Sequence, residues 1–539
     1  MKFGSLALVT VFTLCSATTS FAQDSNEGKE LSFEVTELRS AQEYQETIAL
    51  AEQLLGANQF HEGLLQLVDV VETGDDSEEY YRDAEFLIGV GLFHLGLYQS
   101  SYSYFEKVLD AEPRHARYGE VLPWLVALHQ KIPGESATLE RMAEYEESAY
   151  PAELKDEIYF YVGQFYYYQS RLRDSLKALR KVTTGREQYY LRARYLEGVV
   201  QVRNNNAKAA SAAFKSILRY EKESGTNSNV ADKIYRMSLL SLARIFYTIG
   251  QYETAIRYYD QIPEYSPDWL ESLLEVSWSY FQIDNFGRAL GNLHTLNSPY
   301  FEEEYYPEAL VLEAVILHSN CHYSSALDSI HRFIKSYHPL YKELDQQLKV
   351  PRDPNQFYGW LARMSRSGAD LSKRLKRIFN TTLTDRKLNR LFRFILHLNQ
   401  EIEALKRLSQ NAPMTAFSAS LIGEISAFRA LVIGDAGSLA RSRLVSVHKE
   451  LRRQLSDALK VKFETLNSRK RALKKGLSMT GEATRDGNPY DLDSEHQYWP
   501  FDGEYWKDEL DSYTVELDNR CPKQKPRAKR GSTKGDAAK

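Results

Sequence analysis

The sequence has few of the residues and motifs on which enzymes and metal proteins depend. Only three of its 539 residues are cysteine, which excludes a disulfide framework or a cysteine-rich metal site as the basis of the fold. It contains no His-Glu-x-x-His, no Gly-x-Ser-x-Gly, no Cys-x-x-Cys and no glycine-rich loop ending in Lys-Ser or Lys-Thr. We therefore predict no catalytic residues, no cofactor and no metal, and a protein that is not an enzyme.

The nearest approach to a metal site is the group His318, Cys321 and His322. Cys321 and His322 are adjacent, so on a helix their side chains would point about 100° apart. A tetrahedral site would therefore need ligands from elsewhere in the chain. An unrecognised hydrolase in the C-terminal region is an alternative, which a pocket with converging ionisable groups would support.

Long apolar runs are also scarce, and the clearest one stands at the start of the chain. Lys2 is followed by the apolar run 3–14, and the small residues Ser20 and Ala22 precede Gln23. This pattern is typical of a secretory signal peptide over residues 1–22, with cleavage between Ala22 and Gln23. Since no later stretch reaches about 18 apolar residues, we expect no membrane span and a soluble exported chain.

The cysteines leave two questions open. Cys15 ends the apolar run, but the bulky Leu14 before it departs from the small residue of lipid-anchored proteins, so we favour soluble export over lipidation. Cys321 and Cys521 can pair in an oxidising compartment. They fall in regions that we assign to different domains, and we favour two independent thiols.

Charge divides the chain into blocks. Residues 1–340 hold 30 Lys and Arg against 48 Asp and Glu, a net charge of −18, whereas residues 341–480 hold 28 against 12, a net charge of +16. Residues 481–539 have a net charge of −3. We predict a main domain boundary at this change of sign, between residues 339 and 340.

The stretch 237–267 carries a pattern that recurs through the acidic block. Apolar residues three or four apart form one face of a helix that ends near Gly250, and the same spacing then begins again. Two small residues, Ala243 and Ala255, stand where the two helices of a hairpin would approach most closely. The positions that define the pattern are Leu239, Leu242, Ala243 and Phe246, then Tyr252, Ala255, Tyr259 and Ile262, with Pro267 as the stop.

This unit resembles the tetratricopeptide repeat, a helical hairpin of about 34 residues. Seven convincing units and one degenerate unit, over residues 114–150, can be placed between residues 41 and 339. The resemblance implies an all-α, right-handed superhelical solenoid with a concave protein-binding groove. With the signal peptide, the chain resembles periplasmic repeat proteins of Gram-negative bacteria that scaffold envelope assemblies, some of them at the outer membrane.

The resemblance places the first helix of each hairpin along the groove. Candidate groove residues, in the groove or in the core beneath it, are therefore Tyr159, Tyr166, Phe246, Trp278 and Tyr280. Tyrosine is abundant, with 36 residues, and runs such as 166–168 cannot bury every ring because neighbouring helical residues diverge. We expect most of these rings to pack between hairpins and some to bind other envelope proteins.

The basic region 340–480 has a different pattern. Leucines and isoleucines from Leu388 to Leu408 alternate steps of three and four, with Asp385 able to cap the helix, and a second seam runs from Leu444 to Ala458. We predict a coiled-coil-like antiparallel pair of these two seams, with a bend or break at 434–437. The basic side chains predict a solvated face, or contact with anionic envelope material or with the acidic repeat block, and export argues against nucleic acid.

The remaining segments are short. Residues 23–40 are a polar N-terminal segment, and residues 523–539 predict a disordered basic tail. Residues 481–522 are rich in aromatics without helical spacing, and we expect a strap docked on the body. The alternative is a peptidoglycan or other glycan-binding module that uses Tyr498, Trp499, Tyr505 and Trp506.

Overall fold

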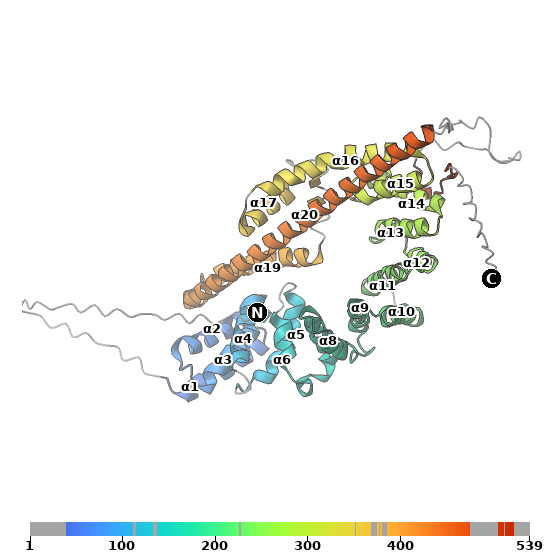
Figure 1. Cartoon of the computed structure of the whole chain (residues 1–539). Helices are drawn as coiled ribbons and strands as arrows, with labels where there is room; N and C mark the ends of the chain where they lie inside the picture. The colour runs from blue at the N-terminus through green and yellow to red at the C-terminus, as the bar shows by residue number, and fades with distance from the viewer. Residues whose placement is uncertain are drawn as a thin grey trace, which may run out of the picture.

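The computed structural model describes residues 39–111, 115–132, 137–225, 228–350, 352–367, 375–376, 378–379, 385–474, 505–510 and 512–521 (Figure 1). The predicted signal peptide with its cleavage site at Ala22 and Gln23, the basic tail, and Tyr498 and Trp499 lie outside these residues. The described residues form 19 α-helices and no β-strand. The prediction of an all-α repeat fold is therefore confirmed.

Sixteen helices form eight consecutive hairpins. The first four pair α1 (Ala41–Gly56) with α2 (Phe60–Thr73), α3 (Glu79–His94) with α4 (Tyr98–Asp110), α5 (Tyr118–Lys131) with α6 (Ala137–Glu144), and α7 (Lys155–Tyr168) with α8 (Leu172–Leu179). The next four pair α9 (Glu187–Arg203) with α10 (Ala207–Ser224), α11 (Asn229–Thr248) with α12 (Tyr252–Tyr259), α13 (Trp269–Gln282) with α14 (Phe286–Leu296), and α15 (Pro307–Ser319) with α16 (Tyr323–Lys349).

Seven of the eight hairpins turn in the same way, and the exception is the degenerate pair α5–α6. In each, the residue two positions after the first helix has a positive φ. The N–H of the following residue donates to the carbonyl five residues back over 2.8–2.9 Å. This is the Schellman motif, in which a residue in the left-handed conformation caps the helix and reverses the direction of the chain. The left-handed residues are Asn58, Gly96, Ser170, Asn205, Gly250, Asp284 and Cys321.

Small residues hold the two helices of a hairpin together. An added Cβ at Gly89 would lie 2.9 Å from the Phe105 ring, and one at Gly163 would lie 2.7 Å from the Leu179 side chain. At the corresponding place of the α11–α12 hairpin, Ala243 and Ala255 are both fully buried. The close approach that the sequence predicts at these positions is therefore present.

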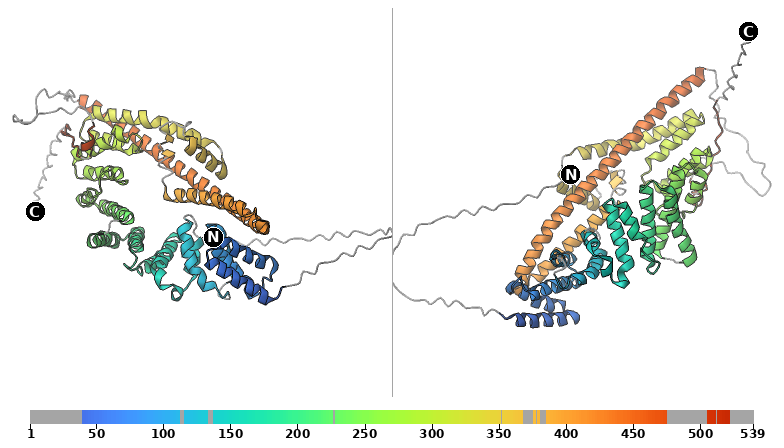
Figure 2. Two further views of the ribbon diagram at one scale, coloured as in Figure 1. Left: turned by 180° about the vertical axis from the view of Figure 1, so that it is seen from behind. Right: turned by 60° about the horizontal axis from the view of Figure 1, so that its bottom comes forward.

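Beyond α16, three helices form a bundle: α17 (Pro354–Ser367), α19 (Arg386–Leu408) and the 60-residue α20 (Thr415–Lys474). Figures 1 and 2 show α20 as a long bar that begins beside the first repeats and ends beside the last repeats. The boundary predicted at residues 339–340 is wrong in position, because α16 continues through Pro339 to Lys349. The change in charge thus falls within one helix.

The predicted pairing of the two basic seams is also wrong. The seam of α19 packs against the first half of α20, where Phe394 lies 5.8 Å from Phe428 between ring centroids. The second seam packs instead on α16, where Tyr341 stacks on His448 at 4.7 Å. Asp385 caps α19, as predicted, by accepting from the N–H groups of Lys387 and Leu388.

The predicted bend at 434–437 is absent, since α20 is one continuous helix there. A Cβ on Gly437 would collide with the Pro354 carbonyl at the start of α17. The absence of a side chain at Gly437 therefore lets the backbone of α17 pack directly against α20. In the sequence, a glycine with this role looks the same as a glycine that breaks a helix.

One helix of the described part meets a composition test for a membrane span, contrary to the sequence expectation. An 18-residue window of α20 has a mean hydropathy of 1.5, with 28% of it buried. The same helix contributes Leu421, Ile425 and Val432 to a core shared with the repeats.

Candidate functional site

The C-terminal bundle is joined to the first repeats by a buried carboxylate. Glu401 of α19 accepts from the backbone N–H of Gln99 at 3.0 Å, from that of Ser100 at 2.7 Å and from the Ser100 hydroxyl at 2.7 Å. These donors belong to the first turn of α4, which has no side-chain cap of its own. A residue about 300 positions later in the chain therefore caps α4.

Apolar and aromatic contacts surround this cap. His397 stacks on Tyr98 at 5.2 Å, and Phe417 lies 6.0 Å from Tyr104. Burial raises the pKa of Glu401, although its hydrogen bonds act in the opposite direction. One continuous buried core contains residues of α1–α9 and of α15, α16, α17, α19 and α20. We call the contact of α19 and α20 with α4 the clasp, and it closes the arc of repeats into a ring.

The hairpins between these ends are held by two smaller cores, one over α9–α11 and one over α11–α16 with Leu510. In Figure 1, α9, α11 and α13 lie on the side of their column that faces α20, while α10, α12 and α14 lie on the outer side. The first helices of these hairpins carry a surface that is described next.

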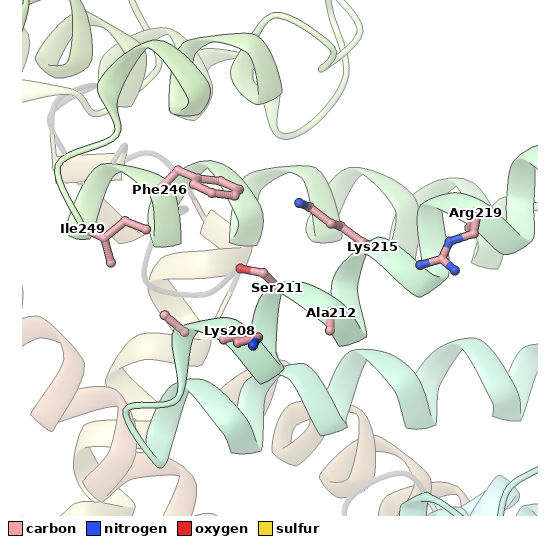
Figure 3. A pocket seen from close by; sticks show the side chains of 8 residues that line it. Lys208, Ser211, Ala212, Lys215, Arg219, Phe246 and Ile249 are labelled. Carbon is pink, nitrogen blue, oxygen red and sulfur yellow. The ribbon is translucent and has the colours of Figure 1, made fainter.

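Three adjoining depressions form what we call the middle groove. The first, about 380 Å³, lies between α9 and α11 and contains Val202, Ser241, Arg244, Thr248 and Ile249. The second, about 410 Å³, shares Arg244 and Thr248 and continues to Tyr259, Glu275, Trp278 and Glu308. The third, about 550 Å³, shares Ile249 with the first and is lined by Lys208, Ser211, Lys215, Arg219 and Phe246 (Figure 3).

Exposed apolar side chains mark the same region. Four successive first helices, α7, α9, α11 and α13, each have a large apolar residue that is 37–50% exposed at their last residue or directly next to it. Hairpins that stack in register place these helix ends along one edge of the solenoid. We call these four residues the end row: Tyr168, Val202, Ile249 and Ile283.

The two ends of the middle groove differ in charge. At the α10 end, Lys208, Lys215 and Arg219 are exposed, and the Lys215 ammonium lies 5.4 Å from the Phe246 ring (Figure 3). At the α13 end, Arg244 forms ion pairs with Glu271 at 2.7 Å and Glu275 at 2.8 Å. Burial acts to lower the pKa of Arg244, but Glu275 and Glu271 together outweigh it and the pKa is raised. The groove is thus basic at one end and carries an excess of carboxylates at the other.

The predicted groove residues occupy different surroundings. Phe246 and Trp278 line the middle groove, where Phe246 stacks on Tyr258 at 5.5 Å and the Trp278 indole N–H donates to Glu308 at 2.9 Å. Tyr280 is buried in the core beneath. Tyr159 and Tyr166 are half-buried on α7, under Lys181 and Arg171 respectively. Their roles in binding stay predictions.

The expectation of independent thiols is wrong, because Cys321 and Cys521 form a disulfide with a Cα–Cα distance of 5.1 Å. Cys321 is the left-handed residue of the last hairpin turn, and residues 505–510 and 512–521, which we call the strap, bring Cys521 to it. The other two members of the candidate metal group have separate partners. His318 contacts the Thr465 hydroxyl at 2.9 Å, and His322 contacts the Asp518 carbonyl at 2.7 Å.

The strap lies on a track of small residues along α14. The Val515 N–H donates to the Gly287 carbonyl at 3.1 Å, and a Cβ on Gly291 would collide with the Tyr513 carbonyl. Tyr505 stacks on His294 at 4.2 Å, so one face of this ring is used in docking. Trp506 is 51% exposed. No group of three or more His, Cys, Asp or Glu side chains suited to a metal occurs among the described residues.

Sequence reasoning missed Glu401 and the end row for different reasons. Glu401 stands in a heptad-like helix, where a charged residue between apolar positions is typical of a solvated face. The end row has a recognisable signal, since each member is a large apolar residue one to three positions before the left-handed turn residue. Such a residue lies beyond the helical stripe that packs into the core.

No family model and no curated protein matches the sequence. Among solved structures, the apo form of RapI aligns over 68% of this chain and 99% of its own, with 13% identity and a TM-score of 0.35. A Rap protein complexed with competence and sporulation factor aligns over 73% of this chain and 100% of its own, with 12% identity and a TM-score of 0.24.

A tetratricopeptide repeat protein from Parabacteroides merdae aligns over 55% of this chain and 93% of its own, with 13% identity and a TM-score of 0.23. The seven turns of one geometry and the small residues between paired helices carry the assignment of the fold. The chain is a TPR-like helical repeat protein.

Proposed function

We propose that this chain is a non-enzymatic scaffold whose middle groove binds a segment of another protein in the bacterial cell envelope. The observation that carries the proposal is the end row: four successive repeats each leave a large apolar side chain exposed, and two of these side chains, Val202 and Ile249, line the middle groove. Exposed apolar side chains that line concave surface are typical of recognition sites rather than of a solvated face.

The chemistry of the groove restricts its partner. An apolar side chain of the partner would fill the space between Val202 and Ile249, since both line the same depression. Acidic groups beside that anchor would meet Lys208, Lys215 and Arg219, which line the depression that also contains Phe246. We therefore expect a segment with an apolar anchor next to Asp or Glu, bound with its acidic side toward α10.

The clasp supports this function by holding the groove in one shape. A solenoid with free ends can change its curvature, and part of the binding free energy is then spent on ordering it. Here both ends of the arc belong to one core, so the groove is formed before a partner arrives. This arrangement favours binding without a large conformational change.

The envelope location is part of the proposal. The apolar N-terminal run with its Ala22–Gln23 cleavage pattern supports export to the periplasm, and the outer membrane is a candidate site of association. The Cys321–Cys521 disulfide also supports an oxidising compartment, because such bonds are rare in reducing ones.

The test compares groove variants in the chain from residue 23. Ile249→Asp places a charge at the centre of the groove, and Lys215→Glu with Arg219→Glu reverses its basic end. Leu50→Asp is the matched control, because Leu50 is 47% exposed on α1, far along the chain from the groove. Each protein is used for affinity capture from envelope extract, followed by quantification of recovered proteins.

We expect one or more stoichiometric partners with the wild type and with Leu50→Asp, and at least about a tenfold loss with either groove variant. Recovery of no stoichiometric partner by the wild type would contradict the proposal. Equal recovery by wild type and groove variants would also contradict it, since binding would then use another surface.

A further inference from the structure

We propose that the C-terminal end of α20 is a membrane-surface element that lies on a bilayer of anionic lipid. This region has no part in the clasp or in the middle groove. Leu459, Phe463, Leu466 and Leu473 are 46–67% exposed there, although each is a large apolar residue. An apolar surface of this kind at the end of a long helix requires an occupant.

The exposed residues form a single stripe. At about 100° per residue, the four side chains fall within about 80° of arc, over a length of about 21 Å. The opposite side of the same turns is occupied, because Ala458, Thr465 and Ala472 are buried and the Thr465 hydroxyl contacts His318 of α15. The repeats therefore hold the helix with its apolar stripe turned outward.

Basic side chains surround the stripe. Residues 459–474 contain six Lys and Arg and one Glu, a net charge of +5. At the same angular spacing, Lys462 and Arg469 fall on one flank of the stripe, and Lys460 and Lys474 fall on the other. Leucine and phenylalanine between two cationic flanks are the pattern of a helix that lies in the interface of an anionic bilayer.

One residue favours lipid over a dry protein interface. Lys470 falls within the stripe itself, at about 20° from its centre. In a helix-to-helix contact its ammonium would be buried at the seam, which is costly without a partner charge. At a bilayer surface its long side chain can extend to the phosphate groups while its methylenes contact acyl chains. The stripe is therefore better suited to head groups than to a second protein helix.

The experiment uses the full chain from residue 23 with Phe463→Ser and Leu466→Ser together, and measures co-flotation with lipid vesicles. One set of vesicles contains phosphatidylglycerol and phosphatidylcholine, and the other contains phosphatidylcholine alone. Leu431→Ser with Leu396→Ser is the matched control, because both leucines are exposed elsewhere in the bundle. Circular dichroism of each variant confirms that the helices are retained.

We expect the wild type and the control to float with anionic vesicles and to dissociate as salt increases. The double tip variant should bind at least about tenfold more weakly, since it loses two apolar side chains. Lys462→Glu with Lys470→Glu should bind anionic vesicles about tenfold more weakly. No flotation of the wild type, or equal flotation on neutral vesicles, would overturn the proposal.

A fluorescence measurement distinguishes the other occupants. Phe463→Trp should give an indole that is accessible to acrylamide in solution and shifts to the blue with anionic vesicles. Residues 475–504, with a net charge of −5, are a competing occupant within the chain, and a second copy is another. An indole already protected without vesicles would overturn the lipid proposal, and light scattering of wild type and Phe463→Glu would then show whether a dimer is responsible.

Discussion

The two ends of the repeat arc and its middle are built from the same hairpin but are stabilised differently. At the ends, the repeats share one core with the C-terminal bundle, and a buried carboxylate caps α4 across the clasp. In the middle, hairpins depend on their immediate neighbours in two smaller cores, and apolar side chains stay exposed at four helix ends. The difference indicates that closure and binding are carried by separate regions.

This division predicts that mutations in the two regions have different effects on stability and on binding. A change at the clasp or at the strap should lower the free energy of unfolding and have little effect on the chemistry of the groove. A change in the middle groove should reduce partner binding at little cost in stability. The following predictions test that contrast, in order of decreasing expected effect on stability.

The largest effect is expected from Cys321→Ser. Its disulfide joins residues 200 positions apart, and loss of such a link typically lowers the free energy of unfolding by about 4 kcal/mol. Thermal unfolding under non-reducing conditions measures the change. Cys521→Ser and the double variant should match the single variant, because all three remove one bond. A wild type with two titratable thiols would contradict this prediction.

Glu401→Ala should have the next largest effect on stability. It removes the acceptor of three buried donors and should lower the free energy of unfolding by about 3 kcal/mol in urea denaturation. Glu401→Gln keeps one acceptor oxygen and should lose less. Glu403→Ala is the control on the same helix, since its exposed ion pair with Lys406 contributes little. Equal stability of Glu401→Ala and Glu403→Ala would show that the clasp is not stabilising.

The third prediction concerns pH. Burial lowers the pKa of His129 to about 4, and the Arg390 guanidinium acts in the same direction. Between pH 6.5 and pH 4 the unfolded chain therefore binds a proton that the folded chain does not, so stability falls as pH falls. Over that range the wild type should lose about 2 kcal/mol more than His129→Gln. If the stability of the two proteins changed with pH in parallel, this prediction would be contradicted.

The smallest effect on stability is expected from Ile249→Asp. Ile249 is half exposed at the end of α11, so the free energy of unfolding should change by no more than about 0.5 kcal/mol. The same variant should lose partner binding by at least about tenfold, as proposed above. A large loss of stability would remove the contrast, because the groove would then be a structural contact rather than a binding surface.

The repeated part of the fold could be predicted because its signals are local. Gly250 ends a helix, Ala243 and Ala255 allow two helices to touch, and the same signals recur at a regular spacing. Each hairpin then needs only its neighbours to cover its apolar face. Short stretches of sequence are therefore sufficient to predict the solenoid.

The closure could not be predicted in the same way. Glu401 and Ser100 are 301 positions apart, and neither carries a sign of the other in its own neighbourhood. The disulfide was missed for the same reason, since Cys521 reaches Cys321 only because the strap follows the small residues Gly287 and Gly291 of α14. Gly437 was misread because a glycine that permits a crossing looks in sequence like a glycine that ends a helix.

The central claim is that Glu401 of the C-terminal bundle caps α4, while the hairpins that carry the middle groove are folded by their own cores. Hydrogen–deuterium exchange of the wild type and of Glu401→Ala, resolved at the amides of Gln99 and Ser100, tests it most directly. We predict slow exchange of these two amides in the wild type, and exchange at least about tenfold faster in the variant, with α11 and α13 unchanged. Equal exchange at Gln99 and Ser100 in both proteins would contradict the account.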